Sequence, residues 1–473
     1  MEIKTHEKQS CINYMENNIK NQGNNNIIIQ GITDSSITLE VNGATQEIQN
    51  EMAALNALLE EMNAQQVQMA DKIYDLAELG QADLGVKKTF NVLITKKLML
   101  ALSENGLVQA QKFLDKTKSI NGWENDSRFS DVAKNLITFA FVGVIGTQLR
   151  KIMAIGKEAL SEEKQQTYIQ ACYIASQKAI QLLNFTLISA FWDAQKSGNY
   201  ELDEAETKEL RLFFDDSIER SLADYATLLD TLIKLFEKHG LALPLKGLKE
   251  LKLERFKKTC NRIKKLHDLL EKSQHSLMTC FEIEGQLTQF LSHLILFMNY
   301  EMLSIKSVIY DEKRTSTPQY IHSYIELGID QKFNENTEKL NILKTPVVTD
   351  AVLIYDKRSN YDVYVNLSPF VIDYNTQMFE KGAKICFFSS KHISDASLNY
   401  RFLEDNSIEN VNFSNMLNDN TKLENLMKEK SNYIKLKFDL IFQQFEEAKK
   451  EVLKNSTEAE GGAEDVSFDD LFG

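Results

Sequence analysis

Three residues near the C-terminal end of this sequence could together form a nucleophilic site. Cys386, His392 and Asp395 carry a thiol, an imidazole and a carboxylate, the groups that activate a cysteine nucleophile when they meet. The stretch Lys384–Phe388 (KICFF), however, is typical of an apolar β-strand. Strand alternation places Cys386 and Phe388 on one face, so we expect Cys386 to be a buried structural cysteine.

The common catalytic and cofactor motifs are missing from the sequence. It contains no GxxxxGK[ST] phosphate loop, no GxGxxG after a strand, no HExxH and no GxSxG. The seven histidines show no metal-ligand spacing, since His267 and His275 are eight positions apart and His293 lies well beyond them. We therefore expect no metal site and no cofactor, and favour a protein that is not an enzyme.

One further spacing involves Arg262 and His267 in the run RIKKLH, on a segment expected to be helical. This Arg-x4-His spacing resembles the R-x4–6-H signature of HEPN ribonucleases. The resemblance implies that Arg262 would bind phosphate and that His267 would act as acid and base, paired across a dimer. Ile263 follows Arg262 where that family usually has a polar residue. An ordinary basic helix face is the alternative interpretation of the same residues.

The composition is that of a cytoplasmic globular protein. A chain of 473 residues is expected to form two to four domains. The net charge of −14 argues against a broad nucleic-acid surface, and the basic segment Lys246–Lys265 is the one local exception. The five scattered cysteines form no CxxC pair and indicate reduced, buried thiols. The polar, charged start of the sequence is unlike a signal peptide.

The N-terminal region has the pattern of a small β-hairpin followed by an amphipathic helix. Ile27–Gln30 and Ser36–Val41 are short β-branched runs around a turn. A single apolar stripe at helical spacing follows, and it must pack on another element or another chain. Its residues are the first set of predicted partner-binding residues: Ile48, Met52, Leu55, Leu59 and Met62.

Long helices are expected in the middle of the chain, because the first proline is Pro244 and proline breaks helices. The helical patterns cover residues 86–102, 107–117, 131–159, 162–196, 203–239 and 248–310. The last of these would either kink near Gly285 or project as a coiled coil. Two uncharged stretches, 135–149 and 179–192, are each shorter than the roughly 20 residues that span a membrane. They are expected to be buried core helices.

The later prolines, Pro318, Pro346 and Pro369, lie in a region with strand-like segments. Those segments are 347–355, 361–367, 369–373, 384–389 and 398–403, and a helix is expected over 417–453. The acidic tail, residues 456–473, contains Phe468, Leu471 and Phe472 among acidic residues. Spaced apolar side chains in such segments often bind a groove on a partner, so these three complete the predicted partner-binding set.

The predicted fold class is mainly α: a long-helix bundle with a small N-terminal β-hairpin-helix unit and a C-terminal α+β module. The expected organisation is a disordered lead-in (1–26), an interaction domain (27–120), a helix bundle (121–317), an α+β domain (318–412), a C-terminal helix (413–455) and an acidic disordered tail (456–473).

Five stretches resemble parts of bacterial conflict proteins. Asn24–Leu59 and Ala70–Tyr74 resemble the N-terminal effector-associated adaptor regions of STAND-type antiphage defence proteins. Residues 365–375, 382–388 and 402–406 are similar to an accessory β module of such proteins. The resemblance implies coupling of sensors to toxic effectors through contacts between adaptor domains. The NTPase or peptidase domain usual in that family is missing, which favours an adaptor over an effector.

The leading functional expectation is a non-enzymatic adaptor or scaffold of a bacterial defence system. It would bind a protein partner, an effector or a sensor encoded nearby, and could form homo-oligomers. The first alternative is a helical membrane-disrupting effector that uses the hydrophobic segments 135–149 and 179–192. The second alternative is the HEPN-like ribonuclease.

Overall fold

The computed structural model describes residues 28–29, 39–40, 90–120, 122–156, 161–312, 314–315, 318–328, 339–343, 347–359, 363–392, 397–411 and 428–456. The chain divides into two compact units, Met1–Lys88 and Thr89–Gly473. In the first unit, strand β1 (Ile28–Ile29) pairs antiparallel with strand β2 (Leu39–Glu40). The apolar stripe from Ile48 to Met62 lies outside the described residues.

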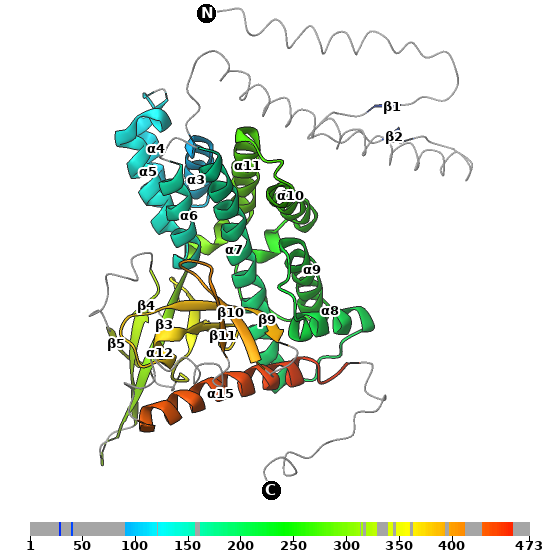
Figure 1. The fold of residues 1–473 in the computed structure, drawn as a ribbon, viewed down its shortest axis with the longest axis vertical. Coiled ribbons are helices and arrows are strands. Elements are labelled where there is room, and N and C mark those ends of the chain that lie inside the picture. The colour runs from blue at the N-terminus through cyan, green and yellow to red at the C-terminus, as the bar shows by residue number, and fades with distance from the viewer. Residues whose placement is uncertain are drawn as a thin grey trace, which may run out of the picture. The chain divides into compact units, whose positions relative to one another are not determined.

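The second unit is mainly α with some β, as expected from the sequence (Figure 1). Its α-helices are α3 (Val92–Glu104), α4 (Val108–Thr117), α5 (Ser127–Ala140), α6 (Gly143–Ile155), α7 (Glu162–Ser197), α8 (Glu204–Asp215), α9 (Leu222–Lys238), α10 (Leu253–Glu271), α11 (Leu277–His293), α12 (Tyr374–Gln377) and α15 (Lys428–Val452). Short 3₁₀ turns are η1 (Trp123–Asn125), η2 (Leu248–Glu250) and η3 (Ile295–Asn299).

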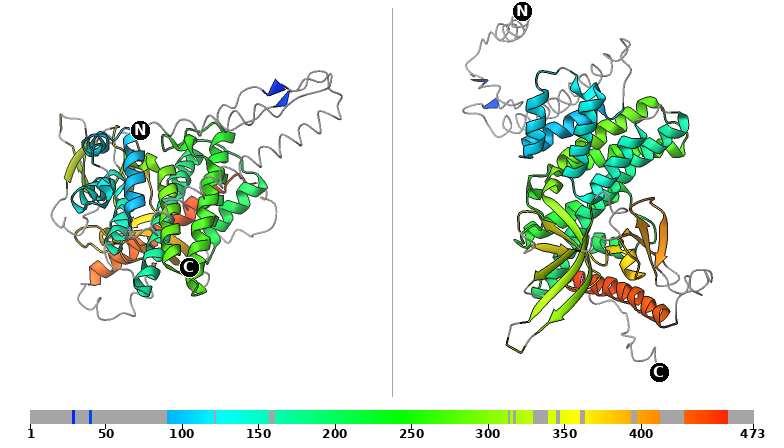
Figure 2. Two further views of the ribbon diagram at one scale, coloured as in Figure 1. Left: turned by 90° about the horizontal axis from the view of Figure 1, so that it is seen from above. Right: turned by 90° about the vertical axis from the view of Figure 1, so that its left-hand side faces the viewer.

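The strands of this unit form two antiparallel sheets. The first has the order β5-β4-β3-β6-β7 and the second the order β11-β10-β9-β8. Figure 2 shows the strands gathered at one end of the helices, with the orange-red helix α15 running alongside them. The strands are β3 (Tyr300–Asp311), β4 (Gln319–Glu326), β5 (Lys339–Leu343), β6 (Val352–Asp356), β7 (Tyr364–Asn366), β8 (Val371–Asp373), β9 (Ile385–His392), β10 (Ser397–Phe402) and β11 (Ile408–Val411).

Helix α7 is the central element of the helical layer. Its 36 residues span about 54 Å at 1.5 Å per residue. Every residue from Ala175 to Ser189 is buried, because α6, α9, α10, α11, α15 and β7 all pack around this helix. A helix that is buried on all sides lies inside the core of its protein. The uncharged stretch 179–192 is therefore buried core, as the sequence predicted.

One hydrophobic core connects the helices to the second sheet and to α15. The ring of Phe185 on α7 lies 5.9 Å from that of Phe213 on α8, 5.8 Å from Phe370 and 6.1 Å from Phe387 on β9. Phe370 in turn lies 5.9 Å from Phe445 on α15. Such aromatic pairs contribute beyond the area that they bury. Elements up to 260 residues apart in sequence thus share one set of contacts.

The helix predicted over residues 131–159 is in fact two helices. Helix α5 ends at Ala140, Phe141 and Val142 are extended, and α6 begins at Gly143. At Gly143 a Cβ atom would lie only 1.9 Å from the carbonyl oxygen of Leu327, so the backbones of α6 and of the residue after β4 are in direct contact. Tertiary packing rather than a proline sets this break, and the uncharged stretch 135–149 spans it.

The prediction of one helix over 248–310 is wrong. Helices α10 and α11 form a hairpin, and Ser276 caps α11 by accepting a hydrogen bond from the amide of Thr279. The chain then enters the 12-residue strand β3, so strands begin at Tyr300 rather than near Pro318. The pattern over 203–239 likewise divides into α8 and α9, and the capping box Ser221–Asp224 starts α9.

Five of the predicted strand segments contain observed strands, β6 to β10, with shifted ends. The sequence did not indicate β3, β4, β5 or β11. Helix α15 lies within the helix predicted over 417–453, of which residues 417–427 are outside the described part of the chain.

Candidate functional site

Arg262 and His267 contact different helices. The Arg262 side chain forms an ion pair with Glu282 of α11, with its Nε donating at 3.0 Å. The Nε2 of His267 lies 2.6 Å from the Oε1 of Gln170 on α7, and its ring stacks on Tyr173 at 3.9 Å. Burial lowers the pKa of His267, which favours the neutral ring. Within one chain, the two side chains therefore do not share a site.

The described cysteines are buried thiols, as the sequence predicted for them. Cys386 has no exposed surface on β9, and Cys172, Cys260 and Cys280 are buried on the helices. Burial raises the pKa of Cys280 to about 12 and also raises the pKa of Cys172 and Cys260. A protonated, inaccessible thiol is a poor nucleophile. Asp395, from the suggested nucleophilic group, lies outside the described residues.

A buried polar network surrounds Asp373 between the two sheets. Its carboxylate accepts hydrogen bonds from the hydroxyls of Ser304 and Thr376, both at 2.7 Å, and from the amide of Lys384 at 2.9 Å. Lys306 forms an ion pair with the same carboxylate. Asp373 and Ser304 have no exposed surface, so this network fastens β3 of one sheet to β8 of the other. It is a structural connection, because no substrate can approach the serine hydroxyl in this arrangement.

Lys178 is a fully buried cation in the middle of α7. Its Nζ donates to the Oε1 of Gln181 at 3.1 Å and lies 5.2 Å from the centre of the Phe387 ring. Desolvation lowers the pKa of Lys178 to about 7, although the nearby Glu219 acts in the opposite direction. An amine with this pKa could serve as a base. Its complete burial against β9, however, leaves no room for a substrate, so Lys178 is part of the core rather than of a site.

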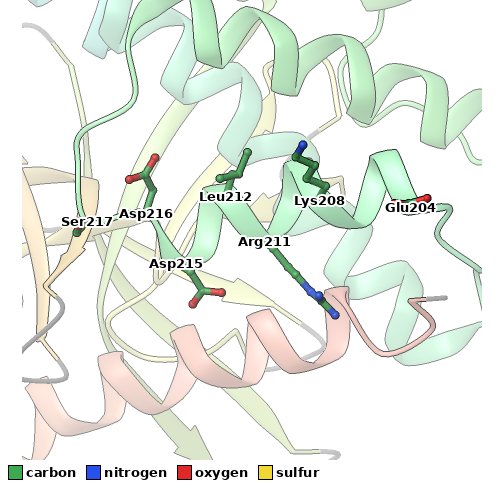
Figure 3. Close-up of a pocket in the computed structure, with 7 residues that line it drawn as sticks. All are labelled: Glu204, Lys208, Arg211, Leu212, Asp215, Asp216 and Ser217. Atoms are coloured by element: carbon green, nitrogen blue, oxygen red, sulfur yellow. The ribbon is translucent and has the colours of Figure 1, made fainter. Parts of the chain in front are cut away.

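A surface groove of about 420 Å³ lies along α8. Figure 3 shows Arg211 and Asp215 pointing toward α15, with Lys208 and Leu212 on another side of the helix. The full lining is Glu204, Lys208, Arg211, Leu212, Asp215, Asp216 and Ser217. Lys449 of α15 forms an ion pair with Asp215. This ion pair connects α8 to α15. Because the groove is lined by both acidic and basic side chains, it shows no preference for an anionic or a cationic ligand.

An exposed apolar surface on α15 is the most distinct candidate site for binding. Tyr433, Leu436 and Leu440 are spaced three and four residues apart and therefore lie on one face. Their exposed fractions are 52%, 49% and 44%. The ring of Phe379 lies 5.2 Å from that of Tyr433 and is itself 45% exposed. We call these four residues the α15 patch.

The backbone of Phe379 supports a binding role for the α15 patch. Its φ of 55° places a bulky aromatic residue in the left-handed region, where glycine is favoured. An aromatic residue held in strained backbone while half exposed gains little stability from burial. Such outliers cluster at binding sites. The Nζ of Lys437 lies 4.4 Å from the centre of the Phe379 ring, and this cation–π contact stabilises the position of the ring.

The sequence analysis missed the α15 patch for an identifiable reason. A second, neighbouring face of α15 is the core face, with Ile434, Phe438 and Ile441 buried. The two apolar stripes are offset by one residue, so together they looked like one broad core-facing pattern. The signal that could have revealed the patch was the width of the apolar surface on this helix, which exceeds that of a single stripe. The partner-binding residues that the sequence did single out, Ile48 to Met62 and Phe468 to Phe472, lie outside the described residues.

The described residues hold no helix long and apolar enough to cross a membrane. Within the same residues, no three His, Cys, Asp or Glu side chains are grouped as a metal ion would require. Comparisons with known protein families, with curated proteins and with solved structures found no match. The fold and its surfaces therefore define the class no further than a mainly α protein with some β.

Proposed function

We propose that this protein is a non-enzymatic adaptor or scaffold that binds a protein partner through the α15 patch. The carrying observation is the cluster of four half-exposed large apolar side chains, one of them on strained backbone. Contiguous exposed apolar surface on a folded protein commonly marks an interaction site. The buried polar groups around Asp373 and Lys178 connect elements of the fold, which is consistent with a protein that does no chemistry.

The resemblance of the N-terminal region to effector-associated adaptor regions suggests what the partner is. It would be an effector or sensor of a bacterial defence system, encoded near this protein. The N-terminal stripe would supply further contacts in the same assembly. This part of the proposal depends on the resemblance alone.

The test uses the full chain co-expressed with the product of each neighbouring gene, and measures capture and affinity. Replacing Leu436 by Asp removes a half-buried leucine from the interface and adds a charge, at a cost of roughly 2–3 kcal/mol, so we expect Kd to rise about 30- to 150-fold. Gln111→Asp is the matched control, because it adds the same charge at an exposed position of another helix, α4. It should change Kd less than threefold.

Phe379→Gly separates binding from stability. Glycine relieves the positive φ, so the urea midpoint should stay equal or rise, while partner affinity falls at least tenfold. If the full chain binds none of the neighbouring gene products and is monomeric by light scattering, the adaptor proposal is refuted. If a partner binds but Leu436→Asp and Gln111→Asp behave alike, the α15 patch is not the binding site.

A further inference from the structure

The outward face of α10 carries a row of basic side chains. Arg255, Lys258, Arg262 and Lys265 are spaced three, four and three residues apart, which places them on one face of the helix. All four are exposed, whereas Phe256, Cys260 and Ile263 on the opposite face are buried. We call these four residues the α10 basic face.

Three members of the α10 basic face have no counter-ion. Within the described residues, the side chains of Arg255, Lys258 and Lys265 have no hydrogen bond or ion pair, and in this row only the side chain of Arg262 is paired, with Glu282. The surrounding segment 246–265 holds nine Lys and Arg against two Glu, in a chain of net charge −14. Like charges left side by side repel, so this face stores unfavourable electrostatic energy that an anionic ligand would relieve.

An apolar contact lies beside the α10 basic face. Met278 and Glu282 are one turn apart on α11, and Glu282 is the partner of Arg262. In the α10–α11 hairpin Arg262 pairs with Glu282, so Met278, one turn before Glu282, is placed level with Lys265, about one turn after Arg262. The side chain of Met278 is 52% exposed and that of the adjacent Leu277 is 45% exposed. The surface therefore suits an anionic segment that also carries apolar side chains.

We propose that the α10 basic face binds the acidic tail of the same chain. Residues 457–473 carry six Asp or Glu and no Lys or Arg, and they include Phe468, Leu471 and Phe472. This combination of acidic and large apolar residues matches the basic row and its neighbouring apolar contact. The carboxylates of Asp469 and Asp470 pair with the α10 cations, and the aromatic rings rest on Met278.

The start of the tail is close enough to reach α10. Ser456 bridges to Leu202, whose amide donates to the carbonyl of Asn455 at 3.1 Å. The carbonyl of Glu201 lies 2.9 Å from the Nε2 of His239, at the end of α9. Helix α10 packs against α9, and no point on these two short helices is more than about 40 Å from that end. Extended chain of 12–16 residues spans about 40–55 Å, which covers that distance.

Zero-length carbodiimide cross-linking of the full chain tests the contact, because it joins a lysine amine to a carboxylate only where they touch. We expect Lys258 and Lys265 to cross-link to Asp469 and Asp470 within one chain, identified by mass spectrometry. Raising the salt from 0.05 to 0.5 M should lower the yield about fivefold or more. Arg255→Glu should do the same while leaving both reporter lysines in place.

Lys112→Glu is the matched control, since it makes a similar charge reversal at an exposed residue of α4 and should leave the yield unchanged. Cross-links of the tail only to other lysines would overturn the proposal. Mixing isotope-labelled with unlabelled chains reveals exchange, and cross-links found only between chains would overturn it in favour of a second copy. Duplex DNA binding that Arg255→Glu abolishes, but Asp469→Asn/Asp470→Asn leaves unchanged, would show that the face takes nucleic-acid phosphate instead.

Discussion

The substitution Lys178→Met should stabilise the protein near neutral pH and remove part of its pH dependence. The folded protein lowers the pKa of Lys178 to about 7 from its ordinary value of 10.5. Between these values the unfolded chain holds a proton that the folded chain has lost, so stability rises with pH. Near pH 7 the buried ammonium costs about 4 kcal/mol relative to a side chain that never ionises.

Methionine keeps the apolar stem of lysine without its charge. It leaves the Oε1 of Gln181 without its donor, which costs about 1–3 kcal/mol. The net expectation is a gain of about 1–3 kcal/mol at pH 7. The advantage should shrink by about 3 kcal/mol as the pH rises to 9.5, because the wild-type lysine is then neutral in the folded state.

Urea unfolding of wild type and Lys178→Met at pH 6.0, 7.0, 8.5 and 9.5 measures the difference in their free energies of unfolding. The contributions of all other titrating groups cancel in this difference. Lys208→Met on the exposed side of α8 is the control and should leave the pH dependence unchanged. Parallel stability curves for wild type and Lys178→Met across this range would refute the reasoning. So would a loss of stability at pH 7.

Two further substitutions test the contacts that define the fold. Gly143→Ala drives a Cβ atom against the carbonyl of Leu327 and should cost about 1–3 kcal/mol, whereas Gly328→Ala, with open space around it, should stay within about 0.5 kcal/mol in the same urea assay. Equal effects would contradict the close contact. Asp373→Asn leaves the largely buried ammonium of Lys306 without its counter-ion. In the same urea assay, this substitution should lower the free energy of unfolding by about 3–5 kcal/mol. A loss below about 1 kcal/mol would show that the ion pair contributes little to stability.

The sequence correctly predicted those helices and strands whose start, end and periodicity are marked by their own residues. Helix α7 was expected over 162–196 and is observed over Glu162–Ser197, because Glu162 and Glu163 mark its start and Gly198 follows its end. Strand β3 was taken for helix because no glycine or proline separates it from α11. Its run of Ile305, Val308, Ile309 and Tyr310 was nonetheless a β-branched and aromatic signal.

The surfaces were harder to predict than the elements. The α10 basic face could be recognised as a basic segment, but its lack of counter-ions depends on which acidic residues the fold brings near. Predicting the α15 patch would have required knowing which of the two adjacent apolar stripes on this helix is covered by the core. Both are properties of tertiary arrangement, which a single sequence does not carry.

The central position of α7 has a consequence for how this protein is made. The partners of Phe185 on β9 and, through Phe370, on α15 are encoded far downstream, and α15 ends 255 residues after α7. At 5–20 residues per second, a ribosome needs on the order of 13–50 s to cover that interval. Until β9 and α15 have been synthesised, the side of α7 that they cover lacks its native contacts. We therefore expect the nascent chain to depend on chaperones that shield apolar helices until synthesis is nearly complete.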